Sequence, residues 1–224
     1  RDLLGHEEGI RSHTMSGVIT PARRAPGPGV PPRISGYWYG ASAMPVNSST
    51  HLCIANSMYL ALCYVGPYHY DYLAVAADTA IDGKRFEVAL YNPLASGLPG
   101  SRLLYKTYAQ MPAMSGVGAQ RSKVSLSPAF RAPQDYVWAL VWSEDAPTVV
   151  GMSRTRNLNH GWRDTGGDDI TIGNPIGYFT LAGLTHGKTF ATDSLDADFA
   201  DIAVLSTWQA DTANSLIHPY FRRA

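Results

Sequence analysis

The sequence predicts an all-β protein: a jelly-roll-like antiparallel β-sandwich preceded by an extended N-terminal arm. The 224 residues include 21 Gly, 15 Pro, 13 Tyr and 5 Trp, and only 16% of them are charged. Aromatic residues favour strands and Gly and Pro favour turns, so this mixture suits many short strands joined by tight turns. Turn signals also recur along the chain, and no amphipathic helix of about 10–15 residues separates the candidate strands, which argues against a helix-covered parallel sheet.

The first 34 residues differ in composition from the rest of the chain. Five prolines interrupt every apolar period there, and the run Ala25–Arg33 reads APGPGVPPR. Such a run is too broken for a helix or a central strand and favours an extended, semi-rigid segment. We therefore expect an anchoring arm over residues 1–34 and a sandwich over residues 35–224.

From Tyr37 onward the chain is a series of short apolar runs. The expected strands are Tyr37–Met44, His51–Val65, Tyr70–Asp78, Lys84–Asn92, Arg102–Ala109, Gln120–Ser127, Gln134–Ser143 and Thr148–Ser153. Lys84–Asn92 alternates between apolar and other residues, as in a strand with one buried face. Val137–Trp142 is continuously apolar, as in a strand covered on both sides. Asp193–Ala213 is the one stretch where apolar residues approach helical spacing, and a short helix is expected there.

Two cysteines, Cys53 and Cys63, lie in one apolar stretch. A single strand would hold them about 33 Å apart, whereas a hairpin between them would allow a disulfide. Both alternatives stay open. The chain starts at Arg1 rather than at Met, as a processed or shortened N-terminus would.

The charge balance bears on the partners. Eighteen basic residues face 18 acidic ones, which argues against nucleic acid and anionic membranes as partners because both select for clustered Lys and Arg. No uncharged apolar run reaches the roughly 18 residues of a membrane span. The low charge favours neutral, hydroxyl-rich ligands and subunit contacts over ionic recognition.

Four segments carry a resemblance to a known family: Asn56–Tyr59, Tyr70–Val75, Phe86–Leu104 with its Leu-Tyr-Asn and Gly-Leu-Pro-Gly, and Tyr136–Val141. They resemble the strand series of the β-sandwich modules in tail-fibre and head-fibre proteins of tailed bacteriophages or phage-like particles. Ala132–Asp135 departs from the family's usual Pro-Gly. The resemblance implies a protein of the virion surface that attaches to a host glycan, assembles as a homotrimer and contacts other virion subunits through its arm.

Two segments have the composition of a sugar-binding site, where an aromatic face stacks on a pyranose and polar side chains bind its hydroxyl groups. One is the loop Asn157–Asp164, with Trp162 flanked by His160, Asn159 and Asp164. The other is a turn rich in tyrosine that includes Tyr68 and Tyr70. The alternative for the tyrosines is a place in strands or at subunit contacts.

Patterns for other chemistry are weaker. Ala182–Thr189 has the spacing of a phosphate-binding loop, but no α/β unit surrounds it and a hairpin is the better interpretation. Asp193, Asp196, Asp198 and Asp201 supply oxygen ligands without the glycine and glutamate of an EF-hand. Glycoside hydrolysis would need a carboxylate pair drawn from Glu87, Glu144, Asp145, Asp164 and Asp169. We expect no metal, no cofactor and no catalysis.

The sequence thus predicts a fibre, spike or decoration protein of a virion that binds a host-surface saccharide. Two alternatives remain: a purely structural capsid or tail component without a ligand, and a glycan-cleaving depolymerase or its binding module.

Overall fold

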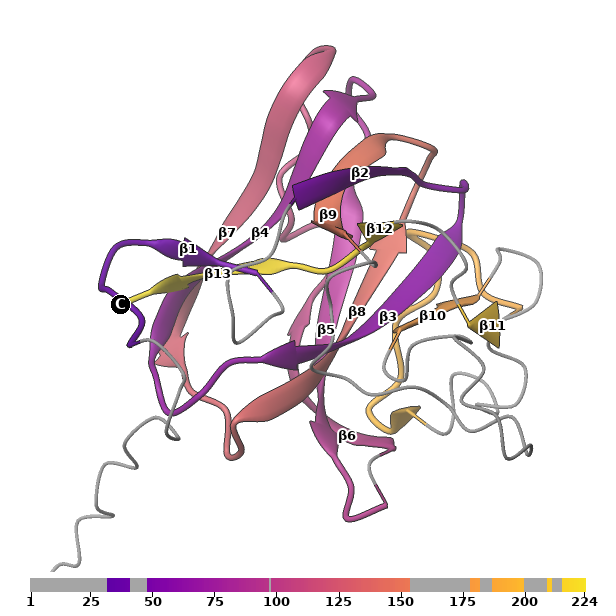
Figure 1. Cartoon of the computed structure of the whole chain (residues 1–224). Helices are drawn as coiled ribbons and strands as arrows, with labels where there is room; N and C mark the ends of the chain where they lie inside the picture. Colours follow the sequence, from indigo (N-terminus) through magenta and orange to yellow (C-terminus); the bar gives the residue numbers. More distant parts are fainter. Residues whose placement is uncertain are drawn as a thin grey trace, which may run out of the picture.

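The computed structural model describes residues 32–40, 48–96, 98–153, 178–181, 187–199, 209–210 and 215–224. Their strands form two antiparallel sheets that pack face to face (Figure 1). The prediction of an all-β antiparallel sandwich is confirmed. Residues 1–31, which make up most of the predicted arm, lie outside the described residues.

Sheet A carries the order β1-β13-β4-β9-β12, with β7 beside β4 and β2 beside β9. Its strands are β1 (Trp38–Tyr39), β2 (Ser48–Leu52), β4 (Tyr70–Ala80), β7 (Gly118–Phe130), β9 (Thr148–Ser153), β12 (Ser215–Leu216) and β13 (Tyr220–Arg223).

Sheet B carries the order β11-β10-β3-β8-β5-β6. Its strands are β3 (Ser57–Tyr64), β5 (Phe86–Pro93), β6 (Pro99–Lys106), β8 (Tyr136–Ser143), β10 (Tyr178–Leu181) and β11 (Gln209–Ala210).

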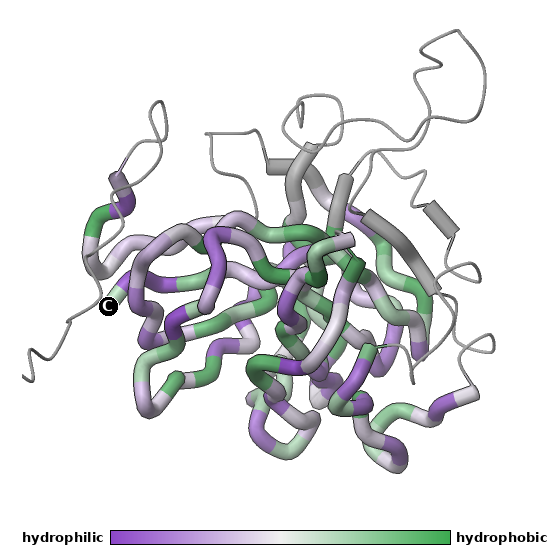
Figure 2. The backbone as a smooth tube through the Cα atoms, turned by 90° about the horizontal axis from the view of Figure 1, so that it is seen from below, coloured by the Kyte–Doolittle hydropathy of each residue, from purple (hydrophilic) through white to green (hydrophobic). Residues whose placement is uncertain are grey.

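The main core lies between the two sheets. Alternate residues of each strand face it, since side chains of a strand point to opposite faces in turn. Sheet B contributes Cys63, Phe86, Val88, Val137 and Val141, and sheet A contributes Leu73, Val75 and Phe221. In Figure 2 hydrophobic stretches run along the strands through the middle of the molecule. Each such side chain, fully buried, contributes about 1.5–3 kcal/mol.

A second hydrophobic cluster covers the outer face of sheet B. Residues 187–199, called here the covering segment, place Leu195 and Phe199 against Trp138 and Trp142 of β8. Strand β8 is therefore buried on both faces, as its continuous apolar run predicts. The prediction that Lys84–Asn92 has a single buried face is wrong, because Ala89 and Tyr91 on the other face are buried in this second cluster.

The expected helix at 193–213 is tested only in part. Residues 193–198 form bends and irregular backbone with an isolated bridge from Asp198 to Ser101, and residues 209–210 form β11. Residues 200–208 and 211–213 lie outside the described residues. Among the residues that the structure describes, no helix is long and apolar enough to cross a membrane.

The expected strand His51–Val65 is two strands that belong to different sheets. A turn separates β2 from β3, and Asn56 in it has a φ of 54°, the left-handed conformation that Asn tolerates better than most residues. Cys53 precedes this turn and Cys63 lies in β3, and both are buried free thiols. Burial raises the pKa of the Cys63 thiol well above its ordinary value, as expected for an unreactive core residue.

Candidate functional site

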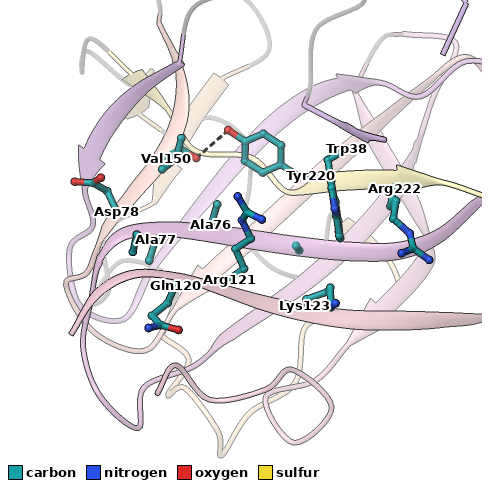
Figure 3. A pocket seen from close by; sticks show the side chains of 12 residues that line it. Trp38, Ala76, Ala77, Asp78, Gln120, Arg121, Lys123, Val150, Tyr220 and Arg222 are labelled. Atoms are coloured by element: carbon teal, nitrogen blue, oxygen red, sulfur yellow. Dashed lines mark hydrogen bonds between the residues drawn. The ribbon is translucent and has the colours of Figure 1, made fainter. Parts of the chain in front are cut away.

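A groove of about 740 Å³ opens on the outer face of sheet A, away from sheet B. Its walls come from β1, β7 and β13, its floor from β4, and Val150 of β9 closes one end (Figure 3). Among the described residues sheet A thus presents an uncovered, hollowed face, whereas the outer face of sheet B is closed by the covering segment.

The hollow follows from the residue pattern of β4. Residues 73, 75 and 77 face the main core, so the alternate residues face outward. Two of these are alanines, Ala74 and Ala76, whose small side chains leave space above the strand. Larger outward residues stand at the two ends, Tyr72 at one and Asp78 at the other.

The strand register brings distant segments of the chain into rows across this face. Trp38 of β1 pairs with Arg222 of β13, and Arg222 pairs with Tyr72 of β4. In the next row Tyr220 pairs with Ala74, which also pairs with Lys123 of β7. Facing residues of paired strands lie about 5 Å apart, so these side chains meet.

Tyr72 is the centre of the aromatic and cationic contacts. The guanidinium carbon of Arg222 lies 4.1 Å from the centroid of its ring, and Lys123 Nζ lies 5.1 Å from the same centroid. The Trp38 and Tyr72 ring centroids are 6.4 Å apart at an interplanar angle of 59°. Because Lys123 and Arg222 lie over the Tyr72 ring, Trp38 is the better placed ring for stacking on a ligand.

Arg222 is held by a carboxylate beside the groove. Its Nε donates to Asp71 Oδ1 over 2.9 Å and its Nη2 donates to Oδ2 over 2.5 Å. These bonds lower the pKa of Asp71. A two-pronged contact of this kind fixes the orientation of the guanidinium over Tyr72.

The two cations of β7 are arranged differently. Arg121 and Lys123 are exposed, and neither forms an ion pair with any residue that the structure describes. In Figure 3 Arg121 extends from β7 across β4 towards Tyr220. Of the twelve residues that line the groove, Asp78 is the one carboxylic acid. The groove therefore offers an indole face, a phenol and positively charged hydrogen-bond donors.

The predicted sugar-binding loop falls outside the described residues. Trp162, His160, Asn159 and Asp164 all belong to it, and their part of the prediction stays untested.

The tyrosine turn has a different position from the one expected. Tyr70 is fully buried and Tyr68 is 9% exposed. The Tyr70 ring packs 5.5 Å from Phe221, and burial raises the pKa of its hydroxyl to about 12. Neither ring offers an open face, so both leave the candidate site.

These tyrosines instead surround Arg33, which the composition had assigned to the arm. Arg33 Nη1 donates to the Tyr70 hydroxyl over 2.8 Å, and Nη2 donates to the Tyr64 carbonyl over 2.8 Å. Its backbone N–H donates to the Tyr68 hydroxyl over 3.3 Å. The guanidinium also lies over the rings of Tyr39, Tyr64 and Tyr70. Arg33 is buried and fixes the start of the described fold.

The other candidate chemistries find little support in the described part of the chain. Lys188, the lysine of the phosphate-loop-like string, forms an ion pair with Asp196 at 2.9 Å within the covering segment. Asp193 accepts the Thr189 N–H over 2.7 Å. No group of three or more His, Cys, Asp or Glu side chains among the described residues could hold a metal ion. Residues 182–186 and Asp201 lie outside that part.

Of the proposed hydrolytic carboxylates, the three that the structure describes have other partners. Glu87 is buried in β5, where it accepts the Tyr105 hydroxyl over 2.5 Å and the Tyr108 N–H over 3.1 Å. Glu144 and Asp145 both pair with Lys84, at 3.2 and 3.7 Å. Asp164 and Asp169 lie outside the described residues.

Sequence reasoning missed Trp38, Arg121, Lys123 and Arg222 as site residues. The signal was present in the strand β7, where Arg121 and Lys123 alternate with Ser122 and Val124, which marks the two cations as one outward face. Their convergence with Trp38 depends on β13 pairing with β4, and those strands are far apart in the chain.

Comparisons with protein-family models, curated proteins and solved structures gave no match to this chain.

Proposed function

We propose that this protein is a non-catalytic, saccharide-binding β-sandwich that uses the groove on the outer face of sheet A. One observation carries the proposal: Trp38 stands at the rim of an open hollow whose floor is made mainly of alanines of β4 and whose walls carry hydrogen-bond donors. An indole stacks on the apolar face of a pyranose, and the polar side chains around it bind hydroxyl groups.

The residues that line the groove favour saccharide binding over hydrolysis. Glycosidases use two carboxyl groups about 5–9 Å apart across the scissile bond. Among the lining residues, Asp78 stands alone as an acid, and the neighbouring Asp71 already accepts two hydrogen bonds from Arg222. The depolymerase alternative is tested by incubating the protein with host polysaccharide and assaying for new reducing ends.

The place of the protein in a virion rests on the resemblance of its strand series to phage fibre modules. We propose that it is a surface component of such a particle, that it assembles as a homotrimer and that residues 1–34 contact other virion subunits. Arg33 supports the proposed role of residues 1–34, because its buried guanidinium would anchor an arm to the sandwich. Equal proteolysis within residues 1–31 in the free and the assembled protein would oppose it.

The direct test of saccharide binding is Trp38→Ala on a glycan array, followed by titration against the best glycan. We expect affinity to fall about tenfold or more, because the variant loses the stacking face. Tyr37→Ala is the matched control: Tyr37 is an adjacent aromatic residue, 63% exposed, that does not line the groove.

Each outcome separates the function classes. Loss of binding in Trp38→Ala with retention in Tyr37→Ala supports the groove as the site. Binding that survives in both variants removes the groove, and Trp162→Ala then tests the loop at 157–164. No binding to any saccharide favours the purely structural alternative.

A further inference from the structure

We propose that the saccharide recognised by the groove is acidic and that its sugar carries a carboxylate. The inference rests on the proposed function of the same groove and names the class of ligand. It departs from the neutral ligand that the overall charge balance predicts, since 18 basic and 18 acidic residues cancel over the whole chain but not in the groove.

The local charge is positive but small. Three cations line the groove, Arg121, Lys123 and Arg222, and two carboxylates lie at it, Asp78 within and Asp71 beside it. Three against two leaves one positive charge. Arg222 already has a carboxylate partner, whereas Arg121 and Lys123 form no ion pair with a described residue and are therefore the cations that remain to pair with an anionic ligand.

The positions of these two cations match a single anionic group on a stacked sugar. Arg121 and Lys123 occupy successive outward positions of β7, opposite Ala76 and Ala74. Since alanine side chains are short, both cations border the free space above the floor. A guanidinium presents paired N–H donors that fit the two oxygens of a carboxylate.

The same accounting argues against a nucleic acid as the occupant. A nucleic acid brings one phosphate per nucleotide, and proteins that bind it neutralise many phosphates at once. One surplus charge and an exposed Asp78 at the end of the groove oppose a run of phosphates. A sugar polymer with an occasional carboxylate fits this charge better.

The experiment uses the full chain on an array that pairs uronate- and sialate-bearing saccharides with their carboxyl-reduced counterparts. Carboxyl reduction converts the carboxylate to a neutral hydroxymethyl group and leaves the rest of the sugar in place. Sulfated saccharides and a single-stranded oligonucleotide complete the set. We expect binding to the carboxylated members, with roughly five- to tenfold weaker binding to their reduced partners.

Two substitutions assign the selectivity to the groove. Arg121→Gln and Lys123→Gln should each reduce the preference for the carboxylated member of a pair, because the affinity for that member falls more than the affinity for the reduced one. Arg131→Gln is the matched control, since Arg131 is an exposed cation that does not line the groove. All three positions are exposed, and the melting temperature of each variant confirms that it folds.

The outcomes separate this inference from the proposed function. Equal binding to carboxylated and reduced saccharides overturns the inference and leaves saccharide binding intact. A preference for sulfated sugars alone, or tighter binding of the oligonucleotide, also overturns it. Binding to no saccharide overturns both proposals.

Discussion

The outer faces of the two sheets both carry tryptophan, but one face is covered by another segment of the chain and the other is open among the described residues. Sheet B presents Trp138 and Trp142 outward, and the covering segment closes over them with Leu195 and Phe199. Sheet A presents Trp38 and Tyr220 outward, and its groove lies open among the described residues. A tryptophan is part of a core on one face and available to a ligand on the other.

The difference lies in what surrounds each tryptophan. On sheet B Trp142 belongs to a cluster of apolar side chains, and leaving that cluster exposed would cost about 25 cal/mol for each Å². On sheet A the neighbours are alanines and the cations Arg121, Lys123 and Arg222, so covering the face would require those charges to lose their water. Aromatic content alone therefore does not distinguish the covered face from the open one, and the charged neighbours do.

The largest effect that tests this comparison is on stability. Trp142 is fully buried, its Nε1 donates to Asn56 Oδ1 over 3.0 Å, and its ring meets Phe190 at 5.3 Å. We expect Trp142→Ala to lower the free energy of unfolding by about 4 kcal/mol, through lost contacts and a cavity. Chemical denaturation measures this change.

Trp38→Ala is the counterpart on the open face. Its side chain is half-exposed, so we expect a loss of about 1 kcal/mol in unfolding free energy. Equal losses in the two variants would mean that the two faces do not differ in the way described.

The second effect is a loss of stability at acidic pH, and it arises in sheet A, the sheet with the open face. His218 lies just before β13, is fully buried and has an Nε2 atom without a hydrogen-bond partner among the residues that the structure describes. Burial lowers its pKa to about 4 from an ordinary value of 6.5. The unfolded chain binds the proton first as pH falls, so stability is lost between pH 6.5 and 4, by about 3 kcal/mol in total.

His218→Gln should remove this part of the pH dependence, and His218→Phe should remove it too. The two replacements differ in packing, so a loss of slope common to both identifies titration as the cause. Urea unfolding at several pH values measures the slope, and curves parallel to that of the wild type would contradict the assignment.

The strands were predictable from the sequence because their causes are local. Alternation and turn residues located the strands from Tyr70 to Ser153, and the continuous apolar run of β8 indicated its two buried faces. The turn at Asn56 was missed because an apolar stretch continues through it. The strand pairing shows that β2 and β3 belong to different sheets, and the left-handed backbone of Asn56 lies in the turn between them.

The candidate site was less predictable because its causes are not local. Trp38, Tyr72 and Arg222 meet only through the pairing of β1 with β13 and of β13 with β4. The tyrosine turn was misread for a related reason: Tyr68 and Tyr70 are exposed or buried according to where Arg33 lies, and Arg33 is more than thirty positions away in the chain. Composition cannot decide such a contact.

The smallest effect concerns the covered face and has the opposite pH dependence. Burial is the main cause that raises the pKa of Glu87, although the Tyr105 hydroxyl and the Tyr108 N–H both donate to it. The folded chain therefore keeps this proton to a higher pH than the unfolded chain, and stability falls as pH rises from about 4.5 through the folded pKa. Glu87→Gln should remove that fall. The difference in unfolding free energy between the variant and the wild type should therefore shift in favour of the variant as pH rises, as measured by urea titrations.

Tyr105→Phe keeps the acid but removes a donor to the carboxylate, and we expect it to extend the fall in stability to higher pH. If the Glu87→Gln and wild-type curves stay parallel, burial does not desolvate this carboxyl group, and water reaches the closed face of sheet B more freely than its contacts indicate.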